Sequence, residues 1–294
     1  RRDPGNAEPV HRRLSGFHVA VGKRLSVSEF GEGDPLSGLR QTGQVHYLRC
    51  YLGDLGAKTV IEEPTYFDRD YLAEFGAFYS TSATGYPNVC RRLHFFDVAC
   101  SRTQLVRAMG GGERVLARLR DAYLGFVVVR PIPGAQLGRT VLKWYPESQP
   151  DNPRVIAPSR EYVSHIGGVA FKVQGLAWQQ QDQGVGACAT VALWSMLHAS
   201  AFDEPHAIPP TATITRAAHR TASLGARVFP SSGLRIEQVL EVIKETALAP
   251  LVVEGDTAGP IPTGESSVPM RGFTRSRFGA SCGTLIRSGY TALL

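Results

Sequence analysis

Apolar residues at helical spacing mark the last third of the chain. Residues 188–202, CATVALWSMLHASAF, place Ala189, Leu193, Met196 and Leu197 close together on one side of a helix. The polar, proline-rich DEPHAIPPT then ends this predicted helix. Shorter helices are predicted over residues 211–225 and from residue 232 to about residue 247, and Pro250 stops the second of them. A short strand at 251–253, a loose Gly-, Pro- and Ser-rich segment at 255–268, and the opening of another strand in SGYTALL at 288–294 are expected to follow.

The preceding part of the chain mixes helix and strand patterns. Residues 57–61 form a β-branched run, and Tyr71, Phe75 and Tyr79 mark one helical face. Further strands are expected within 91–98, 124–129, 140–146 and 168–178. Residues 1–40 are rich in glycine, proline and charge and show little periodicity, which predicts a poorly ordered lead-in. The pattern therefore predicts a mixed α/β (α+β) protein with an N-terminal domain at 41–172 and a second domain at 173–294.

Composition narrows the classes of function. The 294 residues carry a net charge of +6, but the basic residues are scattered among acids rather than gathered in a dense patch, which argues against a nucleic-acid-binding protein. No apolar run approaches the length needed to cross a membrane, so we expect no membrane partner. Five widely spaced cysteines in a chain of this length favour reduced thiols and a cytoplasmic protein over a disulfide framework.

The stretch QQQDQGVGACATVALW, residues 179–194, carries the strongest candidate chemistry. It leads through glycines into Cys188 at the start of an apolar helix, where the helix N-terminus stabilises a thiolate. Gly184 and Gly186 permit a tight turn that directs backbone N–H groups toward a reacting oxygen. The competing interpretation is an inert core thiol, which is the commoner use of such a cysteine. The polar run favours a nucleophile, because glutamines between a strand and a buried helix have no evident packing use.

This stretch resembles the nucleophile region of papain-like cysteine peptidases, closest to the compact bacterial C39 (bacteriocin-processing) type. The resemblance implies that Cys188 is the nucleophile, that a nearby glutamine helps to form the oxyanion hole, and that a histidine on a later strand is the base. It covers residues 179–199 well and extends only in outline to residue 294. It implies a papain-like core, incomplete at the C-terminus, that acts on a peptide or protein substrate without a cofactor.

The sequence departs from the family pattern in two ways. Ala189 replaces the glycine that usually follows the nucleophile, and Asp182 stands six residues before Cys188, where the family has its glutamine. Gln181 and Gln183 flank that position; we expect Gln181 to be the oxyanion donor, and Gln183, Asp182 and Gly186 to contact the substrate.

The histidine base is the second departure. His198 lies about 15 Å along the same helix from Cys188 and cannot be the base. His206 and His219 are more typical of surface or packing positions, and His165 precedes the cysteine on a strand. The resemblance therefore implies a base just beyond residue 294. If there is none, the alternative is a non-catalytic peptide- or protein-binding module on the same fold.

The remaining motifs are weaker. His46 with Cys50, and Cys90 with His94, have a spacing that places a zinc ligand pair on one face, but we expect no metal site because each pair also fits a core element. Cys282 precedes no apolar helix, and the glycine turn at 110–113 lacks the Gly-Lys-Ser/Thr ending of a phosphate loop.

Overall fold

The structure is a computed structural model that describes residues 24–144, 159–200, 208–220, 228–231, 233–253, 255, 257–263, 266–272, 274–288, 291 and 293. Within these ranges it is a mixed α and β protein, as predicted, and every strand pairing in it is antiparallel, so it belongs to the α+β class. None of the helices in these ranges is long and apolar enough to cross a membrane.

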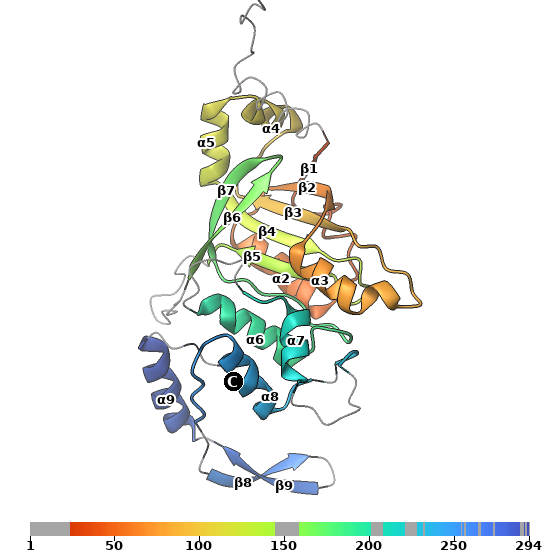
Figure 1. Cartoon of the computed structure of the whole chain (residues 1–294). Helices are drawn as coiled ribbons and strands as arrows, with labels where there is room; N and C mark the ends of the chain where they lie inside the picture. The colour runs from red at the N-terminus through yellow and green to blue at the C-terminus, as the bar shows by residue number, and fades with distance from the viewer. Residues whose placement is uncertain are drawn as a thin grey trace, which may run out of the picture.

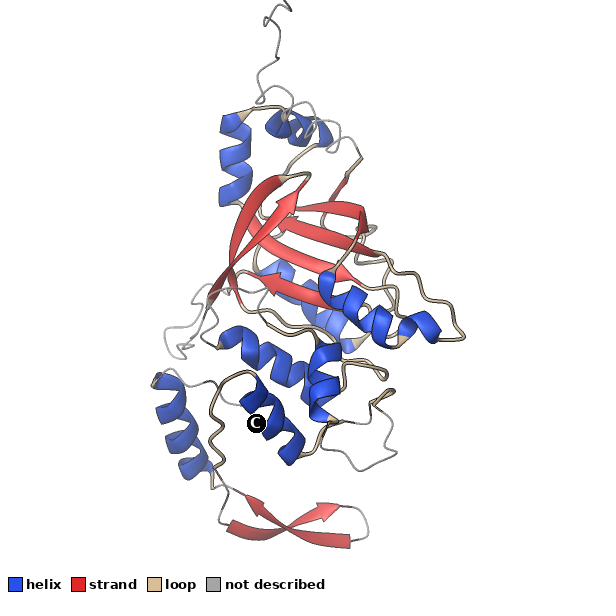
Figure 2. Cartoon of the chain, in the orientation of Figure 1, coloured by secondary structure: helices blue, strands red, loops and turns tan. Residues whose placement is uncertain are grey.

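A five-stranded antiparallel sheet forms the centre of the first part of the chain (Figures 1 and 2). Its strands follow one another in space as they do in sequence: β1 (Ser26–Glu29), β2 (Thr59–Tyr66), β3 (Cys90–Phe96), β4 (Tyr123–Val129) and β5 (Leu137–Leu142). Sequential neighbours are joined by antiparallel pairs, for example Leu93 of β3 opposite Val127 of β4. Strands that are neighbours in the sheet are therefore consecutive in sequence, although helices lie in the connections that precede β2, β3 and β4.

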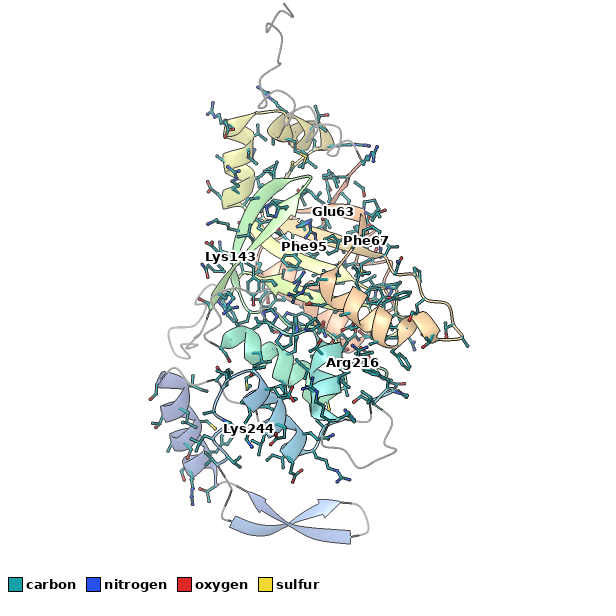
Figure 3. All side chains as sticks on the ribbon, in the orientation of Figure 1. Glu63, Phe67, Phe95, Lys143, Arg216 and Lys244 are labelled. Atoms are coloured by element: carbon teal, nitrogen blue, oxygen red, sulfur yellow. The ribbon has the colours of Figure 1, made fainter. Side chains whose placement is uncertain are left out.

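The sheet is apolar on both faces, so both must be covered. Along the second half of β4, Val127 and Val129 belong to one buried cluster, whereas Phe126 and Val128 belong to another. Helix α2 (Gly43–Asp54) covers the first face with Val45, Leu48 and Leu52, and Phe95 of β3 lies in this same cluster (Figure 3). This period-two alternation is the reason why a strand such as β4 is buried at every position.

The second face is covered by segments far apart in sequence. A hairpin of β6 (Arg160–Ile166) and β7 (Val169–Gly175) packs across β4 and β5. Helices α3 (Arg69–Ala77), α4 (Arg102–Met109) and α5 (Glu113–Asp121), with the short 3-10 helix η1 (Tyr79–Thr81), contribute to the same buried cluster. Gly175 passes so close to β5 that a Cβ there would lie 2.3 Å from the carbonyl oxygen of Leu142.

Three helices continue this cluster away from the sheet. They are α6 (Cys188–Ala199), α7 (Thr211–Ala218) and α8 (Ile236–Glu245), and Figure 1 shows them stacked below the sheet. Leu193, Trp194 and Leu197 of α6 are fully buried and belong to the same cluster as Phe96 and Phe126 of the sheet. The hydrophobic core therefore runs without interruption across residue 173.

A second hairpin and a last helix end the described chain. Strands β8 (Thr257–Thr263) and β9 (Ser266–Gly272) pair with each other, and α9 (Arg275–Arg287) follows them. The segment expected to be loose thus forms an antiparallel hairpin over much of its length.

Three further expectations about local structure differ from the structure. Residues 24–40 are not a poorly ordered lead-in, because β1 pairs with β2 and Leu36 is fully buried; residues 1–23 lie outside the described part. Residues 251–253 are exposed and form no strand, since no neighbouring strand pairs with them. The described residues of 288–294 likewise show no strand.

Candidate functional site

Cys188 is the first residue of α6, and its side chain is exposed. The helix begins after Ala187, which offers no side-chain cap, and the first intrahelical bond in this turn runs from the Val191 N–H to the Ala187 carbonyl. The N–H groups at the start of a helix lack intrahelical acceptors, and they carry the positive end of the helix dipole. The sulfur therefore lies in solvent beside a set of uncapped donors.

The loop before Cys188 is held by one carboxylate. Asp182 is buried, and its Oδ1 accepts the backbone N–H groups of Gly184, Val185 and Gly186 at 2.7, 2.6 and 3.0 Å. Its own N–H donates to the Gly186 carbonyl at 2.9 Å. An aspartate in this position replaces the turn hydrogen bonds that the loop backbone cannot make with itself. Asp182 was expected to contact the substrate. Its buried carboxylate instead stabilises the loop through the backbone N–H groups.

The two glycines of this loop allow close packing. A Cβ at Gly184 would lie 2.8 Å from the Phe78 ring, and one at Gly186 would lie 3.0 Å from Oδ2 of Asp182. Both glycines have ordinary negative φ values, since neither is among the residues with positive φ. Gly186 is buried. Their role is therefore to admit neighbouring side chains rather than to allow an unusual turn.

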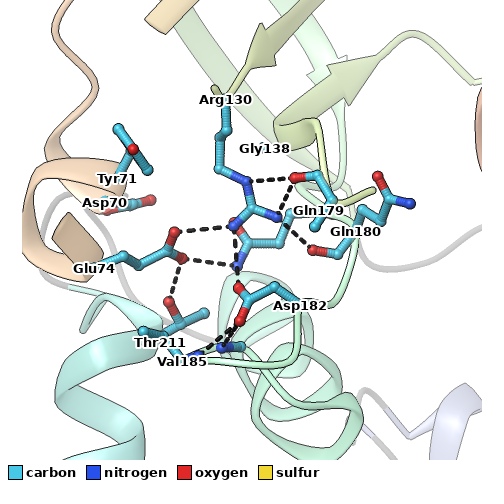
Figure 4. A network of polar contacts seen from close by, with 12 residues as sticks. Asp70, Tyr71, Glu74, Arg130, Gly138, Gln179, Gln180, Asp182, Val185 and Thr211 are labelled. Atoms are coloured by element: carbon cyan, nitrogen blue, oxygen red, sulfur yellow. Dashed lines mark hydrogen bonds and ion pairs between the residues drawn. The ribbon is translucent and has the colours of Figure 1, made fainter. Parts of the chain in front are cut away.

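Behind the loop lies a buried polar cluster, here called the Arg130 junction (Figure 4). It consists of Arg130, Glu74, Asp182, Gln179, Gln180 and Thr211. The Arg130 guanidinium is 1% exposed; it lies 2.9 Å from Glu74 Oε2 and 3.5 Å from Asp182 Oδ2. It also donates to the carbonyls of Ala135 and Gln180. One cation thereby joins the end of the sheet, α3 and the loop that leads to Cys188.

The glutamine run belongs partly to this junction. Gln179 and Gln180 are buried: the first donates to Glu74 Oε1 at 3.4 Å, and the second donates to the Gly134 carbonyl and accepts the Leu137 N–H. Gln181 and Gln183 are exposed. The expectation that the glutamines lack a packing use is therefore wrong for two of them, because their amides satisfy buried polar groups on the sheet and on α3.

Burial and charge pairing both shift pKa values in the junction. Loss of solvent raises the pKa of Glu74, and the attraction of Arg130 opposes that rise. The pKa of Arg130 is raised, because two carboxylates outweigh the cost of burying its charge. Thr211 Oγ1 donates to Glu74 Oε1 at 2.6 Å, so that carboxylate also binds the start of α7.

None of the described histidines hydrogen-bonds to Cys188. His198 is buried, its Nδ1 lies 2.9 Å from the Tyr162 hydroxyl, and its ring packs at 4.2 Å against Trp194. His219 Nδ1 lies 2.8 Å from the Thr215 carbonyl oxygen, and His165 is exposed on β6. His206 lies outside the described residues.

Two buried histidines make the fold sensitive to acid. Desolvation lowers the pKa of His94 to about 4 and that of His198 to about 3. An unfolded histidine titrates near ~6.5, so the unfolded chain binds more protons than the folded chain below that pH. We expect the free energy of unfolding to fall between pH 6.5 and 5 by roughly 1 kcal/mol per pH unit for each histidine.

Urea denaturation at pH 7, 6 and 5 measures this loss. His198→Phe should flatten the pH dependence by about half, because it removes one of the two buried imidazoles. Equal stability at pH 7 and pH 5 would show that the buried histidines are not held neutral.

The two potential zinc pairs do not develop into metal sites in the part of the chain that is described. His46 Nε2 and Cys50 Sγ lie 3.7 Å apart on the exposed face of α2. His94 instead contacts the Tyr123 hydroxyl at 2.9 Å and Glu63 at 3.1 Å, and burial raises the pKa of Cys90. No group of three or more potential ligands occurs among the described residues.

Glu74 and Arg130 were not identified from the sequence. Glu74 falls among ordinary surface-type residues of a short amphipathic helix, and Arg130 follows the apolar run of β4. The hydrogen bond between Thr211 and Glu74 joins residues 137 positions apart. A contact between residues so far apart in sequence leaves no local pattern. Only the polar run at 179–183 indicated this junction.

Comparison of the chain with protein-family models, with curated proteins and with solved structures finds no match.

Proposed function

We propose that this chain is a cysteine-type hydrolase that attacks a peptide or isopeptide bond through Cys188. The observation that carries the proposal is an exposed thiol on the first residue of α6, beside uncapped backbone N–H groups. A helix N-terminus stabilises negative charge, both on an attacking thiolate and on an oxyanion. The rigid Asp182 loop supports the same role, because it fixes the backbone that precedes the nucleophile.

In this mechanism Cys188 gives up its proton to a histidine base, and its sulfur adds to the carbonyl carbon. The Cys188 N–H and the exposed Gln181 amide donate to the resulting oxyanion. Collapse of this intermediate breaks the C–N bond as the histidine returns the proton to the amine. Water, deprotonated by the same base, then cleaves the thioester and releases the acid. No cofactor takes part.

The proposal takes its base from the papain-like resemblance. In that arrangement the histidine comes after the helical half of the fold, and the exposed Gln183 borders the substrate cleft. The fold would then be a papain-like core of the C39 type, in a protein of the bacterial cytoplasm.

The test is the rate at which each thiol reacts. At pH 6.5 we expect iodoacetamide to alkylate Cys188 about 5–10-fold faster than Cys50, because Cys188 starts its helix beside uncapped backbone N–H groups, whereas Cys50 lies in the C-terminal half of α2. Cys90 and Cys100 should react slowest, since burial raises the pKa of both thiols. Peptide mass spectrometry over a time course gives the five rates.

His46 provides the matched control. Its Nε2 lies 3.7 Å from the Cys50 sulfur and can assist that thiol. In His46→Ala, Cys50 should slow while Cys188 keeps its rate. Faster alkylation of Cys50 than of Cys188 in both proteins would remove the support for a nucleophile at residue 188.

A second candidate is a non-catalytic module that binds a peptide or protein through the same surface. Two observations favour it. No described histidine hydrogen-bonds to Cys188, and the amides of Gln179 and Gln180 bind groups of the Arg130 junction and the sheet. For such a module we expect Cys188 to react no faster than Cys50.

A further inference from the structure

A cavity of about 540 Å³ lies between α2, the end of β5 and the segment that follows β7. Four aromatic residues line it: Tyr47, Tyr51, Trp144 and Trp178. Ligand sites in proteins typically measure ~300–1,000 Å³ and are lined mainly by apolar and aromatic side chains. The volume is therefore that of a site for a small organic molecule.

The walls of this cavity are fixed by backbone contacts. The Tyr51 hydroxyl donates to the Lys143 carbonyl at 2.6 Å, which ties α2 to the end of β5. Trp178 and Thr140 exchange backbone hydrogen bonds of 2.8 and 3.0 Å. Tyr51 and Trp178 also pack against the buried cluster beneath α2. The cavity thus exists before any ligand binds, which lowers the entropic cost of binding.

The described residues that line the cavity are uncharged. Its other members are Gly43, Gln44, Leu48, Leu142 and Leu176, and no acidic or basic side chain occurs among the described residues that form it. An aromatic cage for a cation gains from a nearby carboxylate, and an anion needs a cationic partner. The lining therefore fits a neutral molecule.

One residue of the lining, Trp144, carries an unsatisfied polar group. The indole Nε1 of Trp144 is buried and has no hydrogen-bond partner. A buried donor without an acceptor costs free energy, which an acceptor on a ligand would recover. A quaternary ammonium has no acceptor to offer, whereas a carbonyl compound does.

We propose that this cavity binds a neutral, flat aromatic molecule that carries a hydrogen-bond acceptor, with its ring between the aromatic walls and its acceptor on the Trp144 N–H. The site is independent of Cys188 and of hydrolysis.

Equilibrium dialysis of the whole chain against three naphthalene probes tests the proposal. They are 2-acetylnaphthalene, which has a carbonyl acceptor; 2-isopropylnaphthalene, which has the same shape without it; and the 2-naphthyltrimethylammonium ion. We expect saturable binding of one ketone per chain, with an affinity about tenfold above that of the hydrocarbon and of the cation. Binding that does not saturate, or a preference for the cation, would overturn the proposal.

Variants separate the cavity from nonspecific binding. Trp144→Phe keeps a ring but removes the N–H, so it should abolish the preference for the ketone over the hydrocarbon. Tyr47→Ala should weaken ketone binding at least about fivefold. Phe67→Ala is the matched control, because Phe67 and Tyr47 are 59% and 56% exposed. Phe67 is labelled in Figure 3 and lies outside the lining, so its replacement should have no effect on binding.

A filling variant completes the test without removing any contact. A Cβ at Gly43 would meet nothing within 4 Å, so Gly43→Phe adds a ring at the cavity wall while the fold is retained. We expect it to reduce ketone binding at least about fivefold. Unchanged affinity in both Gly43→Phe and Tyr47→Ala would place the probe elsewhere and contradict the assignment.

Discussion

Replacing Arg130 with methionine is expected to lower the free energy of unfolding by about 3–5 kcal/mol. Arg130 and Glu74 are each only 1% exposed, and Asp182 is buried beside them. Methionine fills a similar volume, but it leaves two buried carboxylates without a counter-charge. It also leaves the carbonyls of Ala135 and Gln180 without their donor. Urea denaturation at pH 7 measures the change.

An exposed ion pair gives the matched control. Arg220 and Glu245 lie 2.9 Å apart with side chains 70% and 38% exposed, so Arg220→Met should cost at most about 1 kcal/mol. Adding Glu74→Gln to Arg130→Met should recover part of the loss, because one uncompensated charge disappears. A loss below 1 kcal/mol in Arg130→Met would mean that the junction does not hold the fold together.

Helices with a clear apolar stripe could be predicted from the sequence. The pattern at 188–202 places α6 correctly because Leu193 and Leu197 both face the core, and the start at Cys188 agrees. The strand at 124–129 was equally clear, since its apolar run matches a strand buried on both faces.

Elements defined by their partners could not be predicted. Strand β1, SVSE, is short and polar. It forms because its backbone pairs with that of β2. Strand β6 alternates buried and exposed residues only once β7 folds back on it. Residues 251–253 carry strong strand propensity and remain unpaired, which shows that propensity needs a neighbouring strand.

The sequence predicts only those features of the site that depend on residues close together in sequence. The position of Cys188 follows from its place before an apolar helix. The different roles of the glutamines could not be predicted in this way, because Gln179 and Gln180 bind groups on the sheet and on α3. Asp182 supports the loop through three backbone N–H groups, a role that its position six residues before the cysteine does not reveal.

Replacing Cys188 with alanine is expected to abolish hydrolysis, with a loss of at least about 10³-fold in turnover. No other group at the start of α6 can form the thioester. The side chain is exposed, so the free energy of unfolding should change by less than about 0.5 kcal/mol. Cys50→Ala removes the other exposed thiol of the described helices and should leave turnover unchanged.

The most direct test is the cleavage of a quenched fluorescent peptide library by the purified protein, with and without Cys188→Ala. We expect cleavage by the parent protein and by Cys50→Ala, and none by Cys188→Ala. Cleavage that survives in Cys188→Ala would contradict a nucleophile at residue 188, and so would a folded, inactive parent protein whose Cys188 reacts no faster than Cys50.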